Sequence, residues 1–226
     1  MGAGSLLDRP SYLYWEVDRL IGLPSGTARR WINGYQRGGR SYAPILREAA
    51  FATEWATWGE FVEARILSEF RDQRVPTTRL RAAVLRLRDD FQVAYPLAHM
   101  RPYLEAMNGQ LVVRDGLGGG RHELTTGQRI LEAGSVVMRV ATLTEDESGE
   151  SVVAELPLDP DFPSIRTHPD RLSGQPTIEG RRIAVVTVAG MAEAGEPLAE
   201  IAATYGISIA HVDDAVAYAR KYRLAA

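Results

Sequence analysis

The spacing of apolar residues changes character twice along the chain, and this change limits the fold more than any other feature. Before about residue 107 and after about residue 187, apolar side chains recur at the period of an α-helix with one buried face. Between residues 108 and 158 the pattern gives way to β-branched segments separated by glycines. The sequence therefore predicts an α+β fold that is mainly helical, with a small antiparallel sheet in its middle.

A proline-dense stretch, residues 157–163, resists regular structure and marks a boundary. A second boundary follows the helical pair near the amino end. The predicted parts are a winged helix-turn-helix domain at 1–50, a middle α+β region at 51–158, and a C-terminal helical module at 159–226.

The first fifty residues contain two short apolar stripes separated by a stop. The first stripe comprises Leu13, Val17, Leu20 and Ile21. Residues 22–25 end it, and Ser25 is expected to cap the next helix. The second stripe comprises Ala28, Trp31, Ile32 and Tyr35. At about 100° per residue the members of each stripe share one buried face, so the pair predicts a helix-turn-helix.

The face opposite the second stripe is suited to nucleic acid. It carries Arg29, Arg30 and Asn33. Arginine can bond bidentately to guanine and asparagine to adenine in the major groove, and either can bind phosphate. Gly38 and Gly39 supply a tight turn, which predicts the hairpin of a wing that contacts the DNA backbone or minor groove. The candidate DNA-binding residues are Thr27, Arg29, Arg30, Asn33, Arg37 and Arg40.

The C-terminal module repeats the helix-turn-helix rhythm, with helices expected at about 187–194, 197–205 and 209–222. Asp213 and Asp214 near the start of the last helix favour its dipole but would repel phosphates. We therefore assign this second motif to dimerisation or to a protein partner, and the first motif to DNA.

The middle region is expected to be helical from about 51 to 107 and then to form strands. A stripe of Leu80, Val84, Leu87 and Phe91 is flanked by arginines, which either solvate the helix or add phosphate contacts. The aromatic residues expected in the core are Trp55, Trp58, Phe61 and Phe70. The predicted strands are 111–113, 135–143, 151–156 and, in the C-terminal module, 183–186.

Composition argues against several classes of function. The chain has no cysteine, its four histidines are far apart in sequence, and the glycines at 116–120 precede no Lys-Ser/Thr pair, so we expect no metal, no cofactor and no catalytic residue. No apolar run could span a bilayer and no signal peptide is recognisable, which predicts a cytoplasmic protein without membrane contact. The net charge is −3, but fourteen of the 26 basic residues lie before position 89, and every one except Lys221 is arginine.

Two segments carry a resemblance to a known family. Residues 12–24 (YLYWEVDRLIGLP) and 27–35 (TARRWINGY) resemble a MerR-type winged helix-turn-helix, and more closely the N-terminal domain of VapB-type antitoxins. Residues 172–185 (LSGQPTIEGRRIAV) resemble the small uncharacterised domain at the C-terminus of those antitoxins. The resemblance implies the antitoxin of a type II toxin–antitoxin system. Such a protein would neutralise a VapC-like PIN-domain ribonuclease toxin and repress its own promoter, as a homodimer.

Two alternatives stay open from the residues alone. Helix pairs joined by a glycine-containing turn also occur in proteins that never meet DNA, so the chain could be a protein-interaction or dimerisation module. A hydrolase built on scattered carboxylates is the remaining alternative, and it would require a clustered set of acidic residues in one pocket.

Overall fold

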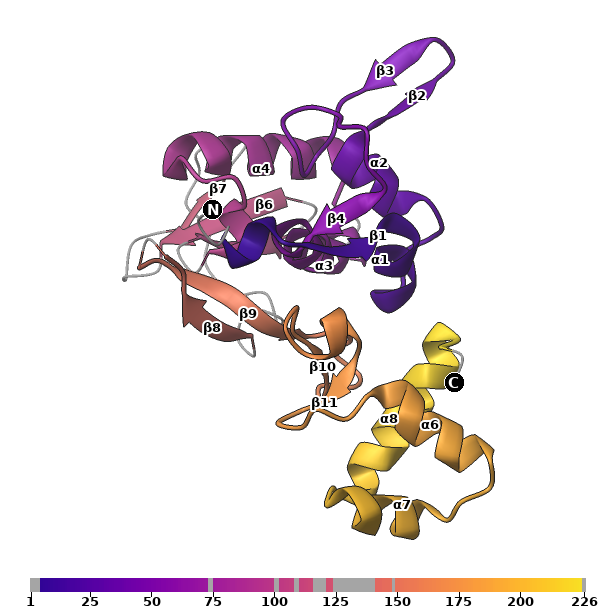
Figure 1. Ribbon diagram of the computed structural model, residues 1–226. Helices are drawn as coiled ribbons and strands as arrows, with labels where there is room; N and C mark the ends of the chain where they lie inside the picture. The colour runs from indigo at the N-terminus through magenta and orange to yellow at the C-terminus, as the bar shows by residue number, and fades with distance from the viewer. Residues whose placement is uncertain are drawn as a thin grey trace. The chain divides into compact units, whose positions relative to one another are not determined.

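The computed structural model describes residues 5–72, 75–99, 102–107, 110–115, 121–123, 141–147 and 149–224 (Figure 1). It combines α-helices with small antiparallel sheets, which confirms the predicted α+β class. The chain forms two compact units, residues 1–154 and residues 155–226. The division into three parts stays a prediction. Among the described residues, none of the helices has both the length and the apolar character that a membrane span requires.

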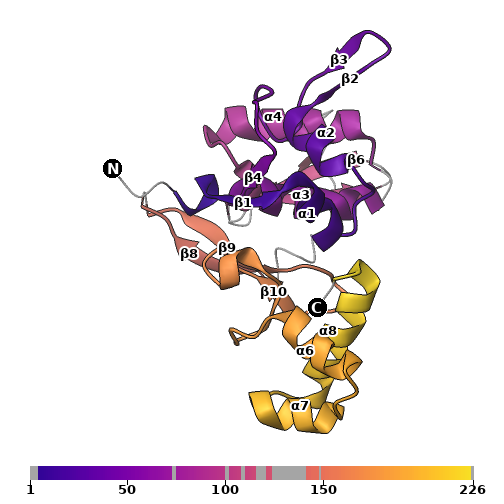
Figure 2. The same ribbon diagram turned by 45° about the vertical axis from the view of Figure 1, so that its right-hand side comes forward.

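The first unit opens with short elements. They are η1 (Leu6–Asp8), β1 (Pro10–Leu13), α1 (Tyr14–Leu20), α2 (Thr27–Asn33), β2 (Tyr35–Arg37), β3 (Arg40–Tyr42) and β4 (Trp55–Thr57). Two helices and a hairpin thus lie where they were predicted. The first helix is shorter than expected, because Leu13 pairs with Trp55 between β1 and the antiparallel β4. In two views the β2–β3 hairpin projects away from α2 (Figures 1 and 2).

Two long helices supply most of the core of this unit. They are α3 (Trp58–Asp72) and α4 (Thr77–Phe91), and a short η2 (Pro96–Ala98) follows. Trp58, Phe61 and Phe70 are buried as predicted, and the Trp58 indole donates a hydrogen bond to the Val153 carbonyl at 2.7 Å. Trp55 is 47% exposed, so its predicted core position is wrong. It lies on the solvent side of the short strand β4.

The arginines that flank the stripe of α4 do not share one role. Arg88 is buried and donates hydrogen bonds to the carbonyls of Leu46 at 2.7 Å and Ala94 at 2.9 Å. Arg86 is exposed and pairs with Asp90 one turn later at 3.4 Å. Arg88 is therefore a structural residue, and Arg86 belongs to the solvated side of the helix.

The strands that complete the first unit are partly those predicted. They are β5 (Pro102–Met107), β6 (Gln110–Asp115), β7 (Arg121–Glu123), β8 (Thr142–Glu145) and β9 (Ser151–Pro157), which crosses into the second unit. β5, β6 and β7 form an antiparallel sheet in that order. The predicted strands 111–113 and 151–156 are confirmed, whereas 102–107 is a strand and not a helix. Most of the predicted strand 135–143 lies outside the described residues.

The second unit packs three helices beside short strands. Its elements are β10 (Ile165–Thr167), η3 (Leu172–Gly174), β11 (Thr177–Ile178), α6 (Val185–Glu193), α7 (Leu198–Tyr205) and α8 (Ile209–Tyr222). β10 pairs antiparallel with β11 and with the end of β9. The three helices are confirmed. The predicted strand 183–186 is wrong, because Val185 and Val188 lie on the buried face of α6 and their burial outweighs the β-propensity of the segment.

An ionic cluster ties α8 to the segment after β9. The Lys221 ammonium lies 2.7 Å from Asp159 and 3.0 Å from Asp161, and the Tyr222 hydroxyl donates to Asp159 at 2.6 Å. Burial raises the pKa of Asp159, but the hydrogen bonds from Lys221 and Tyr222 outweigh burial and leave it below its ordinary value. The hydrogen bond to Asp159 raises the pKa of Lys221. Both groups are therefore charged at neutral pH.

A second buried carboxylate, Glu63 on α3, has the opposite tendency. Its side chain accepts a hydrogen bond from the Leu97 amide at 3.1 Å and lies 3.5 Å from Arg88. Complete burial raises the pKa of Glu63 to about 8, because desolvation outweighs the attraction of Arg88. Burial therefore favours the protonated form of Glu63.

Candidate nucleic-acid interface

The helix α2 is held in place by a carboxylate from α1. Asp18 is buried, and it accepts hydrogen bonds from the amides of Gly26 at 2.6 Å and Ala28 at 2.7 Å. Burial raises the pKa of Asp18 in spite of these bonds. The N-cap of α2 is Gly26, whose φ of +75° favours glycine, so the predicted cap at Ser25 is wrong. The cap comes from the preceding helix, which fixes α2 relative to α1.

A second anchor acts on the other end of α2. The Arg47 guanidinium bonds to both carboxylate oxygens of the buried Glu60 and donates to the Tyr14 hydroxyl at 3.0 Å. It also lies 3.5 Å from the Asn33 carboxamide oxygen, which accepts a stronger bond from the Phe51 amide at 2.7 Å. Asn33 is thus turned toward the loop after the hairpin, and its oxygen is occupied within the chain.

The remaining predicted residues of α2 differ in exposure. Thr27 is buried, and its hydroxyl accepts a hydrogen bond from Arg30 at 2.9 Å. Arg30 itself is exposed. Arg29 has a side chain that is 62% exposed and lies 3.6 Å from the equally exposed Glu54. A contact of this length and exposure contributes little to stability and leaves Arg29 able to exchange its partner for a phosphate.

The hairpin presents its two arginines side by side. Arg37 pairs directly with Arg40, and both are exposed. Gly38 and Gly39 have φ values of +57° and +73°, the signs that a two-residue type I′ turn requires. At the base of the hairpin, the rings of Tyr35 and Tyr42 stack with centroids 4.5 Å apart and planes 4° apart. The stack stiffens a two-stranded ribbon that would otherwise be marginal.

One position between α2 and the hairpin tolerates only glycine. Gly34 has a φ of +71°, and a Cβ at this position would come within 2.5 Å of the Tyr42 carbonyl oxygen. The backbone of the hairpin therefore folds directly against the end of α2.

The six predicted DNA-binding residues therefore differ in their environment. Arg29, Arg30, Arg37 and Arg40 are exposed. Thr27 and Asn33 make hydrogen bonds inside the unit. The sequence interpretation missed Asp18 and Arg47, which position α2. Their partners lie 8 to 33 residues away in sequence, so no local spacing rule would have found them.

Nothing in the described part of the chain offers a metal site, since no group of three or more acidic or histidine side chains is arranged to hold an ion.

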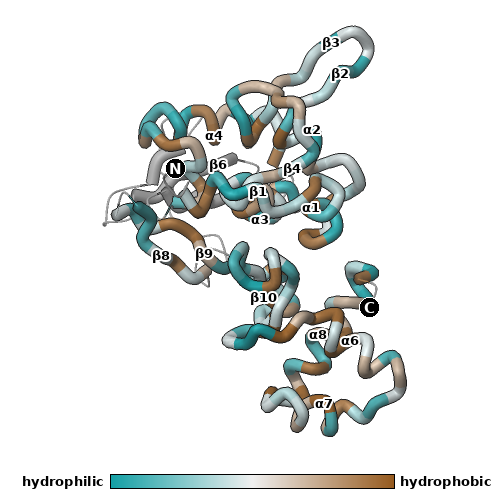
Figure 3. The backbone as a smooth tube through the Cα atoms, in the orientation of Figure 1, coloured by the Kyte–Doolittle hydropathy of each residue, from teal (hydrophilic) through white to brown (hydrophobic). Residues whose placement is uncertain are grey.

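The hairpin contrasts with the core in hydropathy. It lacks the brown, hydrophobic segments that mark the helices of both units (Figure 3).

Comparison with solved structures supports the fold. The crystal structure of Rv2018 from Mycobacterium tuberculosis superposes with a TM-score of 0.65 at 18% identity, covering 93% of this chain and 99% of that one. This likeness concerns the architecture alone. Residues 165–219 match the family described as "Protein of unknown function (DUF433)", which confirms the small uncharacterised domain predicted from the tail.

One comparison reaches the whole chain. The uncharacterized protein Rv2308 of Mycobacterium tuberculosis is 50% identical over 229 residues, which cover all of this chain and 96% of Rv2308. Identity at this level over nearly the full length of both chains includes both units and the hairpin. The chain therefore belongs to the same family as Rv2308.

Proposed function

We propose that the protein is a cytoplasmic DNA-binding antitoxin that represses its own promoter through a winged helix-turn-helix formed by α1, α2 and the β2–β3 hairpin. In this proposal Arg29 and Arg30 enter the major groove, while Arg37 and Arg40 contact the backbone or the minor groove. Asn33 acts by positioning the loop after the hairpin, and Thr27 by orienting Arg30.

The observation that carries the proposal is the cross-strand pairing of Arg37 with Arg40 at the tip of an exposed hairpin. Like charges placed directly opposite each other in an antiparallel pair destabilise it. A polyanion removes this repulsion, and DNA offers phosphates at the density that such a pair requires. The hairpin follows α2 after a single residue, Gly34, so both elements can contact one duplex.

The test uses a duplex from the region upstream of the coding sequence and measures its affinity by fluorescence anisotropy between about 50 and 200 mM salt. The variant Arg37→Ala/Arg40→Ala should weaken binding by about tenfold or more and flatten the salt dependence by about two phosphate contacts. The matched control, Arg182→Ala/Arg220→Ala in the second unit, removes the same charge from exposed positions and should leave both quantities unchanged. Equal losses in the two double variants would show that only the total charge matters.

The toxin half of the proposal comes from the resemblance of residues 12–35 and 172–185 to VapB-type antitoxins. The expected partner is a VapC-like PIN-domain ribonuclease encoded beside this chain. Co-purification of that neighbour, with loss of its ribonuclease activity in the complex, tests this half independently of DNA. The protein is proposed to bind as a homodimer, and an inverted repeat with half-sites about 34 Å apart would be its operator.

A second candidate is a protein-interaction module without DNA binding. Three large aromatic side chains of the first unit favour it, because Trp15, Phe51 and Trp55 are 55%, 68% and 47% exposed. Aromatic residues at such exposure are typical of interface anchors. Absence of salt-dependent binding to the upstream duplex, together with a stable complex with the neighbouring protein, would favour this candidate.

A further inference from the structure

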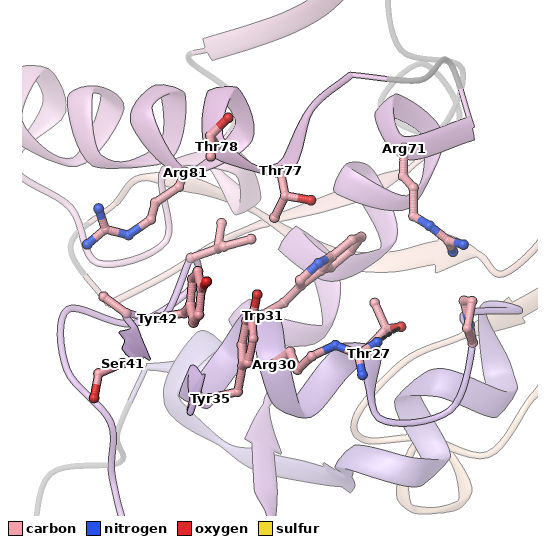
Figure 4. A pocket seen from close by; sticks show the side chains of 13 residues that line it. Thr27, Arg30, Trp31, Tyr35, Ser41, Tyr42, Arg71, Thr77, Thr78 and Arg81 are labelled. Carbon is pink, nitrogen blue, oxygen red and sulfur yellow. Dashed lines mark hydrogen bonds between the residues drawn. The ribbon is translucent and has the colours of Figure 1, made fainter. Parts of the chain in front are cut away.

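A cavity of about 660 Å³ lies in the first unit, between α2, the β2–β3 hairpin and the start of α4 (Figure 4). This volume is in the range of pockets that enclose small organic molecules. Thr27 and Arg30, which belong to the proposed DNA-binding set, line one part of the cavity, and its other lining residues lie outside that set. Its lining combines arginine side chains with aromatic rings. The arginines indicate the charge of a ligand, and the rings indicate its shape.

Three arginines supply the charge of the cavity. Arg71 comes from the last turn of α3, Arg81 from α4, and Arg30 from α2. Arg81 donates one hydrogen bond from Nε to the Pro44 carbonyl at 3.0 Å, which fixes the side chain, and no other partner of it is found among the described residues. Arg71 has no hydrogen-bond or ion-pair partner among the described residues. None of the described residues that line the cavity is acidic.

Three guanidinium groups with no carboxylate among the described lining residues favour an anion. The first turn of α4 adds to this preference, since Thr77 and Thr78 line the cavity where the amide dipoles of the helix point outward. In Figure 4 Arg71 and Arg81 lie on opposite sides of Trp31, and Thr77 lies between the two arginines. Arginine binds planar carboxylates and phosphates through two parallel hydrogen bonds.

The rest of the lining is aromatic. Trp31 is nearly buried at the floor, and the stacked pair Tyr35 and Tyr42 forms one wall. Each tyrosine is about two-fifths exposed and lines the cavity. An aromatic wall next to a cationic group is the arrangement that recognises a flat ring with an attached anionic group.

We propose that this cavity binds a small aromatic anion, a planar ring carrying a phosphate or carboxylate, with the ring against Trp31 and Tyr35 and the anion at Arg71 and the first turn of α4. The proposal does not depend on DNA binding. Arg71, Arg81 and Thr77 are outside the set assigned to DNA, so the two sites can be tested with separate variants.

The test is calorimetric titration of the full chain, without DNA, with four probes. AMP and 1-naphthoate carry both a ring and an anionic group, adenosine lacks the anion, and inorganic phosphate lacks the ring. AMP or naphthoate should bind at least about tenfold more tightly than adenosine and phosphate. Arg71→Gln should weaken that binding by about tenfold or more, and Arg86→Gln, an exposed arginine on α4 outside the cavity, should not.

Three results would overturn the proposal. They are no saturable binding of AMP or naphthoate up to about 10 mM, equal affinity for phosphate alone, or equal weakening by Arg71→Gln and Arg86→Gln. Failure of the DNA proposal has a different signature. In that case Arg37→Ala/Arg40→Ala leaves the affinity for the upstream duplex unchanged, whatever happens in the calorimetric titration.

Discussion

The helix pairs α1–α2 and α7–α8 share the helix-turn-helix pattern but differ in how their second helix is capped. In the first pair the second helix is capped by a buried carboxylate of the preceding helix, Asp18. In the second pair the cap is local, since Ser208 accepts a hydrogen bond from the His211 amide at 3.2 Å. The first pair is therefore specified by a long-range contact and the second by adjacent residues.

The exposed faces of the two helix pairs differ in charge. The first pair offers Arg29 and Arg30 and continues into the arginine-tipped hairpin, while α8 offers Asp213 and has its Lys221 engaged by Asp159. The same backbone pattern thus gives a cationic surface in one unit and a neutralised one in the other. The charge of the outward face therefore distinguishes the two helix-turn-helix motifs, which the spacing of apolar residues alone does not.

The largest expected effect is on the stability of the first unit and comes from Glu63, whose buried carboxylate has a raised pKa, whereas that of Asp159 in the second unit is lowered. Because the folded-state pKa of Glu63 is about 8 and the unfolded value is near 4.5, its contribution to stability is complete below pH 4.5 and is lost as the pH rises through 8. The variant Glu63→Gln mimics the protonated form and keeps an acceptor for Leu97. It should match the parent protein at about pH 4 and exceed its free energy of unfolding by about 5 kcal/mol near pH 9.

Urea unfolding at both pH values measures this difference. A variant that is destabilised equally at the two pH values would mean that Glu63 is ionised and that its pairing with Arg88 stabilises the unit.

The two caps predict an effect of intermediate size. Asp18→Ala leaves two amides without their acceptor and should lower the stability of the first unit by about 2 kcal/mol, whereas Ser208→Ala should cost the second unit about 1 kcal/mol or less. Hydrogen exchange resolves the two units in one experiment. If Asp18→Ala leaves protection in α2 unchanged, the cap does not hold that helix.

An effect smaller than those of Glu63 and Asp18 is expected for Asp159 in the second unit. Its lowered pKa means that its contribution to stability is present above the unfolded value near 3.8 and is lost as the pH falls through the folded-state value. Asp159→Asn should cost about 1 kcal/mol at pH 7, and this difference should vanish near pH 2. Thermal unfolding of the parent and the variant across this range measures it, and Asp161→Asn, at an exposed partner of Lys221, is the control.

The fold was predictable wherever adjacent residues decide it. The Gly38-Gly39 turn and the helices of both pairs follow from local spacing and from the conformational freedom of glycine. The strand 102–107 was missed because its partner, β6, determines it, and the first turn of α6 was missed because burial of Val185 overrides its propensity.

The candidate site was predictable to a similar degree. Exposed arginines can be placed from a helical period, but the inward turn of Asn33 depends on the loop that contains Arg47 and Phe51. Arg71 and Arg81 lie 29 and 39 residues beyond the end of the hairpin at Tyr42, so the cavity arises only from tertiary packing.

The single lysine has a consequence for chemical regulation. Of the 26 basic residues in the sequence, Lys221 alone carries a primary amine on its side chain, and that amine is bonded to Asp159 and Asp161. Acylation at this position removes the charge and leaves the Asp159 carboxylate without its cation. Side-chain amine modification of these 226 residues therefore reaches the second unit only, and it leaves every arginine of the hairpin and of α2 untouched.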